Sequence, residues 1–230
     1  MSASILFDVD STLLDRESFE ELIRLATPDP AVLEQVALLS RLAMEGTISF
    51  QESLSKRIAL SAFTRQHVAQ ICHQLADWIS PGMKELIAKL QAQSIRVWLV
   101  SGGLQEIITH CALLLKIPKE QAQGAKVGWS EDDMPIFDWQ DALSQSKVLG
   151  AQALAAQFTS PTIMIGDGWT DFEVFSKGVA NYFVAYTQWV KRPQVIAAAQ
   201  AHNQNIAQNS QELEAILDRL VFGAFAPATS

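Results

Sequence analysis

The feature that most constrains the fold of this chain is a series of short apolar runs, each of which stops abruptly at a polar or glycine-containing turn. The runs lie at residues 4–9, 97–100, 162–165 and, less cleanly, 180–185. They do not alternate strictly between apolar and polar residues, which is typical of strands buried on both faces of a parallel sheet. Helical patterns accompany them, at residues 84–93, 105–116, 147–157 and 211–220. Strands that alternate with helices predict an α/β fold, with a doubly wound, Rossmann-like parallel sheet.

One long stretch, residues 15–78, interrupts this alternation. It contains four helical segments and no convincing strand, and its clearest helical patterns cover residues 31–44, 50–60 and 65–76. A helical block inserted after the first strand predicts a small cap, or lid, over the core. We therefore expect a core of residues 1–14 and 79–222, a helical cap of residues 15–78 and a short tail of residues 223–230. Residues 124–139 hold two strand-like segments around an acidic turn, and they predict a β-hairpin.

The charge balance excludes one large class of partners. Lys and Arg number 17 against 25 Asp and Glu, which gives a net charge of −8. A surface that binds duplex nucleic acid needs the opposite sign, so we expect no nucleic-acid partner. The two cysteines form no CxxC pair, the N-terminus lacks a signal-peptide pattern, and no window is apolar enough to span a membrane. We expect a cytoplasmic monomer or homodimer that acts on a small molecule.

The first apolar run ends in the sequence Asp8-Val9-Asp10-Ser11-Thr12. On a strand, residues i and i+2 point to the same side and lie roughly 6–7 Å apart. Two carboxylates so close repel each other unless a cation lies between them or one of them holds a proton. One such aspartate can act as a nucleophile while its neighbour, kept protonated, donates to a leaving group. The same residues also fit a solvated acidic turn, because Asp, Ser and Thr are common in turns.

The third run ends in Gly166-Asp167-Gly168-Trp169-Thr170-Asp171, in which Asp171 falls in the first turn of the next helix. There it could cap the helix or support the ligands of a bound ion. In an open α/β sheet, ligands sit at the carboxyl ends of the strands. Asp8, Asp10 and Asp167 would supply at that edge the hard oxygen ligands that Mg²⁺ prefers.

Two further segments could bind phosphate at the same edge. The second run ends in Ser101-Gly102-Gly103 before a helix, where a hydroxyl and free backbone N–H groups could hold an anion. An ordinary helix cap is the alternative for this segment. Lys147 opens the helix that precedes the Asp167 strand. It could neutralise phosphate charge, although most isolated lysines face the solvent.

The order of these elements is more specific than any one of them. A DxDxT turn, a strand that ends in Ser, a Lys and a GDGxxD turn follow one another along a single α/β pattern. This order resembles the haloacid dehalogenase-like superfamily of aspartate-nucleophile phosphotransferases and, within it, the branch of phosphoserine phosphatases. The resemblance is carried by the segments FDVDSTLLDRESFEELI, MEGTISFQESLSKRIAL, SPGMKELIAKL, VWLVSGGLQEII and IMIGDGWTDFEVF. The second of these segments, from the helical insert, is specific to this branch.

The resemblance implies catalytic, phosphate-binding and metal-binding residues at the matching positions. Asp8 would be the nucleophile and Asp10 the general acid/base. Phosphate would be bound by Ser101, Gly102 and Lys147. Mg²⁺ would be held by Asp8, the backbone carbonyl of Asp10, and Asp167, with Asp171 and Thr170 in support. The implied reaction is Mg²⁺-dependent hydrolysis of O-phosphoserine to serine through an aspartyl phosphate, a step of serine biosynthesis.

The resemblance also implies four substrate-binding residues in the cap. Glu17 would meet the ammonium group of the substrate and Arg57 its carboxylate, while Met44 and Phe50 would line the closed pocket. Helical spacing supports Arg57 without the resemblance, because at about 100° per residue it lies only about 20° from Phe50, within an apolar stripe. A buried arginine needs an anionic partner, and its planar fork suits a carboxylate. The alternative is a structural partner such as Glu45 or Glu52.

Several alternatives to this function remain open. The same machinery could act on another small phosphorylated metabolite, or transfer the phosphoryl group to an alcohol instead of water. A receiver-like signalling module could accept phosphate on Asp8, but receivers lack a helical lid and a second carboxylate at +2. A non-catalytic metal-binding protein is a further alternative. The chain departs from the family pattern at Leu104, Val148 and Trp169 and in the hairpin of residues 124–139.

Overall fold

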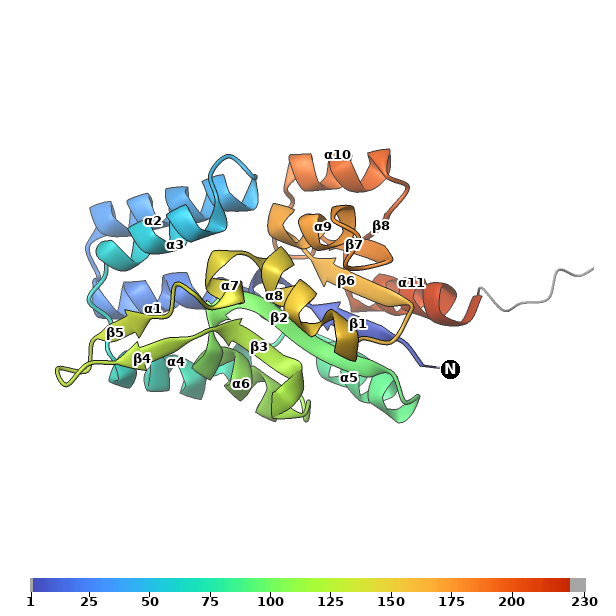
Figure 1. Cartoon of the computed structure of the whole chain (residues 1–230), viewed down its shortest axis with the longest axis horizontal. Helices are drawn as coiled ribbons and strands as arrows, with labels where there is room; N and C mark the ends of the chain where they lie inside the picture. The colour runs from blue at the N-terminus through green and yellow to red at the C-terminus, as the bar shows by residue number, and fades with distance from the viewer. Residues whose placement is uncertain (1, 224–230) are drawn as a thin grey trace, which may run out of the picture.

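Figure 1 shows the computed structural model of the chain, which describes residues 2–223. Six parallel strands form one sheet in the order β3-β2-β1-β6-β7-β8. Their bounds are β1 Ser4–Phe7, β2 Arg96–Leu104, β3 Ala122–Ala125, β6 Thr162–Gly166, β7 Tyr182–Tyr186 and β8 Asn205–Ala207. Strand β1 lies between β2 and β6, with Ser4 opposite both Arg96 and Thr162. The sheet therefore brings the turns after β1, β2 and β6 to one edge.

Successive residues of β1 enter two separate hydrophobic cores, because strand side chains alternate between the faces of a sheet. Ile5 and Phe7 pack in one core and Leu6 in the other, and all three are fully buried. The first core is covered by α5 (Met83–Ala92), α6 (Gln105–Leu114) and α11 (Ser210–Phe222), and the second by α8 (Lys147–Leu154), α9 (Trp169–Ser176) and α10 (Pro193–Ala201). Burial on both faces explains the unbroken apolar runs. The predicted doubly wound α/β core is confirmed.

Four helices between β1 and α5 form the predicted insert, seen in blue to teal in Figure 1. They are α1 Ser18–Ala26, α2 Pro30–Met44, α3 Phe50–Ala59 and α4 Arg65–Trp78. The segments that enter and leave the insert lie side by side, since Leu14 and Ile79 form an antiparallel β-bridge and Asp15 N donates to Trp78 O at 2.9 Å. The helical insert is confirmed, while the limits given for the core and the cap stay a prediction.

The predicted hairpin is confirmed as β4 (Val127–Trp129) and β5 (Pro135–Phe137), which pair antiparallel outside the main sheet. The helix expected at residues 147–157 is α8 followed by the 3₁₀ turn Ala155–Gln157, and a second 3₁₀ turn covers Lys119–Gln121. Sequence reasoning missed β3, β8, α10 and the short α7 (Ala142–Gln145). Strands β3 and β8 lie at the two edges of the sheet and are only four and three residues long, so no apolar run marks them.

No helix within residues 2–223 is both long and apolar enough to cross a membrane. The tail expected at residues 223–230 lies, apart from Gly223, outside the described residues.

Candidate active site

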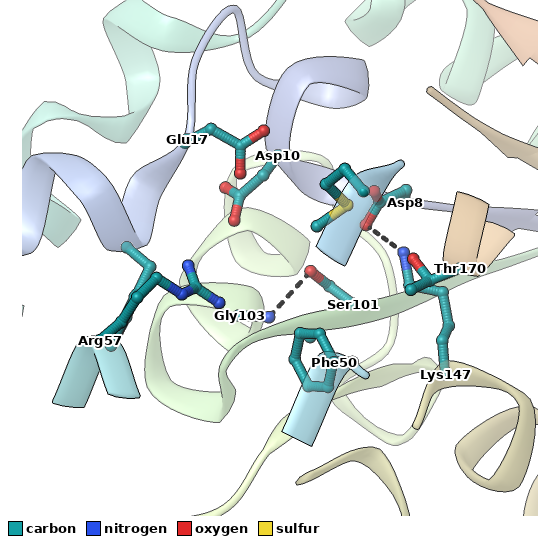
Figure 2. A pocket seen from close by; sticks show the side chains of 12 residues that line it. Asp8, Asp10, Glu17, Phe50, Arg57, Ser101, Gly103, Lys147 and Thr170 are labelled. Carbon is teal, nitrogen blue, oxygen red and sulfur yellow. Dashed lines mark hydrogen bonds and ion pairs between the residues drawn. The ribbon is translucent and has the colours of Figure 1, made fainter. Parts of the chain in front are cut away.

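The candidate active site is a pocket where the edge of the sheet meets the cap (Figure 2). Its lining residues are Asp8, Asp10, Glu17, Phe19, Met44, Phe50, Arg57, Ser101, Gly102, Gly103, Lys147 and Thr170. All of them are predicted site residues except Phe19 and Gly103. Of the predicted set, only Asp167 and Asp171 lie outside the lining, and both are buried behind it. The structure thus brings the predicted residues together, while the role of each stays a prediction.

Asp8 follows β1 directly, but not in the way that the sequence pattern indicated. The strand expected at residues 4–9 ends at Phe7, and residues Val9–Leu13 form a wide turn that is closed by a hydrogen bond from Leu14 N to Val9 O at 2.8 Å, with Asp10 extended and Ser11 at a φ of 52°. Asp8 Oδ1 accepts a hydrogen bond from Val9 N at 2.8 Å and so caps this turn. Such local bonds compete with the ladder of a sheet. Asp8 itself is extended and its N donates to Ile165 O of β6 at 2.9 Å, so it continues the strand by one residue; the expectation that Asp10 also projects from the strand is wrong, although both line the pocket.

Asp10 lies in an environment that favours its protonated form. Its Oδ1 accepts a hydrogen bond from Ser18 N at 3.0 Å, and only 9% of the residue is exposed. Burial raises the pKa of Asp10 to about 8, with a further contribution from the negative charge of Glu17. At neutral pH Asp10 can therefore donate a proton, as a general acid must.

Three buried carboxylates lie beside each other at this edge. Oxygen atoms of Asp8, Asp167 and Asp171 lie within 4.8 Å of one another. Asp171 Oδ2 accepts from Gly168 N at 2.9 Å, and its carboxylate occupies the space that a Cβ on Gly166 would fill. Burial raises the pKa of Asp167 well above its ordinary value and that of Asp171 to about 7. A buried set of carboxylate oxygens with this much mutual repulsion fits a hard divalent cation. Asp171, which was expected only in support, lies as close as the other two.

Two cations offset part of this negative charge. Lys147 Nζ lies 2.8 Å from Asp8 Oδ1 and also pairs with Asp171. Burial lowers the pKa of Lys147, but the charges of Asp171 and Asp8 outweigh it and raise the pKa above the ordinary value. The alternative that Lys147 faces the solvent is therefore wrong.

The second cation, Arg192, was missed by sequence reasoning. Its Nε donates to Asp167 Oδ2 at 2.8 Å, and its Nη2 lies 3.6 Å from Glu17 Oε1. Arg192 thus connects a carboxylate of the core with one of the cap. The available signal was weak: Arg192 follows the fourth apolar run by several residues and directly precedes Pro193, the first residue of α10.

The Ser101-Gly102-Gly103 segment is part of β2 and not the cap of α6. Helix α6 begins at Gln105, so the alternative role of Ser101 as a helix cap is excluded. Ser101 Oγ accepts from Gly103 N at 3.1 Å, which leaves its own proton free for a ligand. The Phe50 ring of the cap lies directly over Gly102, where a Cβ would overlap it. The absence of a side chain at Gly102 therefore makes room for the Phe50 ring against β2.

The cap contributes one anionic and one cationic side chain to the pocket. Glu17 Oε1 accepts from Ser11 Oγ at 2.7 Å, and burial raises the pKa of Glu17. Arg57 is 4% exposed, its Nη1 donates to Ser40 Oγ at 3.2 Å, and its Nε has no hydrogen-bond partner.

Among the described residues, no carboxylate lies within ion-pair distance of Arg57, and Glu52 pairs instead with Lys56 at 2.7 Å. The alternative of a structural glutamate partner for Arg57 is therefore wrong.

Comparisons with known proteins agree with this geometry. The model of the haloacid dehalogenase-like hydrolase family matches residues 5–176. The phosphoserine phosphatase of Rattus norvegicus is 31% identical over 216 residues, which is 92% of this chain and 93% of the relative. A solved structure of a phosphoserine phosphohydrolase-like protein from Francisella tularensis subsp. tularensis SCHU S4 is 31% identical, with a TM-score of 0.88 over 94% of this chain and 99% of the other.

A structure described as a phospho-aspartyl intermediate analogue of phosphoserine phosphatase has the same fold, with a TM-score of 0.74 at 23% identity over 95% of this chain and 99% of the other. From its motifs, its pocket and these matches, the chain belongs to the haloacid dehalogenase-like hydrolases, and its similar curated relatives are phosphoserine phosphatases.

Proposed function

We propose that this enzyme hydrolyses O-phosphoserine to serine and inorganic phosphate through an aspartyl phosphate on Asp8. The observation that carries the proposal is the layout of charge in the pocket. Lys147 and Asp8 lie on one side of the pocket, and Arg57, which has no ion-pair partner among the described residues, lies on the other, with Ser101 between them (Figure 2). Two buried polar atoms of the pocket, Arg57 Nε and Thr170 Oγ1, have no hydrogen-bond partner among residues 2–223. A ligand with an anionic group at each end would satisfy both sides.

Asp8 and Asp10 perform the two chemical steps. An oxygen of Asp8 attacks phosphorus, the bond from phosphorus to the seryl oxygen breaks, and the departing oxygen takes the proton of Asp10. Asp10 is then a carboxylate and removes a proton from water, whose oxygen attacks the phosphorus of the aspartyl phosphate. The bond from phosphorus to the Asp8 oxygen breaks, and inorganic phosphate leaves. The pKa of about 8 suits Asp10 to both tasks near neutral pH.

Negative charge on the phosphoryl oxygens is balanced by groups of the core. The Ser101 hydroxyl and the backbone N–H of Gly102 donate to these oxygens, and Lys147 supplies a positive charge beside Asp8. Mg²⁺, held by Asp8 and Asp167 with Asp171 beside them, would add a second positive charge. Thr170 lines the same side of the pocket.

The cap selects the amino-acid end of the substrate. Glu17 accepts from the ammonium group, and the planar guanidinium of Arg57 donates to the carboxylate. Met44 and Phe50 close the pocket around the short seryl carbon chain and exclude water from the first step. This division of tasks predicts a strong preference for a phosphate ester that is also an amino acid.

Phosphate release from a panel of esters tests the proposal. We expect O-phosphoserine to have a kcat/KM at least about tenfold above that of O-phosphoethanolamine, which lacks the carboxylate. Removal of divalent ions with EDTA should stop release, and added Mg²⁺ should restore it. A higher kcat/KM for a different ester, or transfer of phosphate to an added alcohol in preference to water, would contradict the proposal.

A further inference from the structure

The guanidinium of Arg57 is held by an aromatic ring and not by an acid. Its Cζ lies 4.9 Å from the centre of the Phe19 ring, which also lines the pocket. The only side-chain hydrogen bond of Arg57 within the described residues is the one from Nη1 to Ser40. One hydrogen bond leaves the plane of the guanidinium free to tilt, so the direction of its fork depends on the Phe19 ring.

The Phe19 ring is fixed in turn by Phe63, which does not line the pocket. The two rings meet edge to face, with centres 5.7 Å apart and planes at 85°. Phe63 lies between α3 and α4 and is completely buried. Both residues belong to the helical insert, so the contact by itself would move with the cap.

Two further aromatic neighbours of Phe63 come from the hairpin that follows the core strand β3. Trp129 of β4 and Phe137 of β5 also meet the Phe63 ring edge to face, at 6.3 Å and 6.5 Å. Figure 1 shows this hairpin running out from the sheet toward α1 and α4.

The hairpin is itself held from both sides. Trp129 Nε1 donates to Glu106 Oε1 of α6 at 2.9 Å, and Arg65 of α4 lies over the Trp129 ring at 5.5 Å and pairs with Asp133. The aromatic path from the hairpin to Arg57 is therefore anchored in the core.

We propose that Phe63 is a positioning residue, and that through it the β4–β5 hairpin sets the direction of Arg57 toward the carboxylate of the substrate. This inference rests on the proposed function, because it assigns that carboxylate to Arg57. Phe63 touches neither the substrate pocket nor the reacting atoms, and it acts only through the Phe19 ring. The hairpin is thus a determinant of selectivity that lies outside the helical cap.

Replacement of Phe63 by leucine tests the proposal, since leucine keeps an apolar side chain and removes the ring. We expect Phe63→Leu to raise KM for O-phosphoserine about two- to tenfold, the range of one aromatic pair, with kcat within about twofold. Turnover of O-phosphoethanolamine should not change. In an Arg57→Ala background, Phe63→Leu should cause no further loss, because the group that it positions is gone. Phe137→Leu, at the hairpin end of the path, should reproduce a smaller part of the effect.

Phe158→Leu is the matched control, because it removes an edge-on contact with Trp98, at 5.2 Å, in the second core. It should leave both substrates unaffected. Equal losses on the two esters, or additive losses with Arg57→Ala, would overturn the proposal.

A measurement without substrate separates this inference from the proposed function. The buried Nε–H of Arg57 should give a distinct, slowly exchanging ¹⁵N resonance in the wild-type protein. Phe63→Leu should shift and broaden this resonance, and Phe158→Leu should not. An unchanged resonance would overturn the inference. If the wild-type enzyme hydrolysed both esters equally, the proposed contact between Arg57 and the substrate carboxylate would be wrong. The resonance would still show whether Phe63 holds Arg57 in place.

Discussion

The floor and the wall of the pocket are built on opposite principles. The floor, at the edge of the sheet, gathers Asp8, Asp10 and the acids behind them, and burial raises the pKa values of most of this set. The wall, from the cap, is apolar around Phe19 and Phe50 and holds the single buried cation Arg57. The floor has more negative charge than its own cations offset, whereas the wall carries Arg57 and one acid, Glu17, and no described carboxylate lies within ion-pair distance of Arg57. In the proposed function, this difference separates the chemistry of phosphate transfer from the choice of ester.

The largest expected effect comes from the floor. Asp8→Asn removes the attacking oxygen and should lower kcat by at least about 10³-fold, since loss of a nucleophile affects every turnover. The fold should remain, because the side chain can still accept from Val9 N. Phosphate release and circular dichroism measure the two expectations. Asp15→Asn, which alters an acid paired with the exposed Arg16, serves as the control. Asp8→Asn enzyme with more than about a tenth of wild-type turnover would show that the wrong residue has been assigned as nucleophile.

The second effect concerns the charge balance of the floor. Lys147→Met leaves Asp8 and Asp171 without their shared cation, and should destabilise the metal-free protein by about 3–5 kcal/mol at pH 8.5, above the pKa of about 7 of Asp171. Urea denaturation in EDTA measures the loss, and added Mg²⁺ should recover part of it. Lys56→Met breaks only the exposed pair with Glu52 and should cost less than about 1 kcal/mol. Equal losses for the two variants would mean that the buried acids do not depend on Lys147.

The smallest expected effect lies where floor and wall meet. The negative charge of Glu17 helps to raise the pKa of Asp10, so Glu17→Gln should lower that pKa below about 8. Because the first step needs protonated Asp10, the alkaline limb of kcat/KM should move to lower pH. Glu21→Gln removes an acid that pairs with Arg24 on the cap surface and should not move the limb. A pH–rate profile with O-phosphoserine decides; a limb that stays in place or moves to higher pH would remove Asp10 as the proton donor.

Much of the floor could be predicted from the sequence, because its residues follow strands that are marked by clear apolar runs. Asp8, Ser101 and Asp167 each come at the end of an apolar run, and parallel strands place such ends together. The wide turn after Phe7 could not be read in this way, because it depends on a hydrogen bond from Val9 N to the Asp8 side chain. Arg192 was missed because it lies in the loop between β7 and α10, outside any apolar run or helical pattern.

The wall was less accessible to sequence reasoning. Helical spacing placed Arg57 in an apolar stripe, and the structure buries it there. Its partner ring Phe19 carries no such signal, since one buried aromatic residue on an amphipathic helix indicates only a core. The contacts of Phe63 with Trp129 and Phe137 join segments that are far apart in the chain. Such tertiary pairs leave no periodic trace in a single sequence.

The β-bridge between Leu14 and Ile79 has a consequence for how such enzymes can diversify. Because the two ends of the insert meet within about 5 Å, the two chain connections to the four-helix block lie side by side. A block attached in this way can be exchanged for another of different size or shape without rethreading a strand or separating Asp8 from Asp167. An enzyme of this kind can therefore change its substrate by exchanging the whole insert, while the reaction at the sheet edge stays the same.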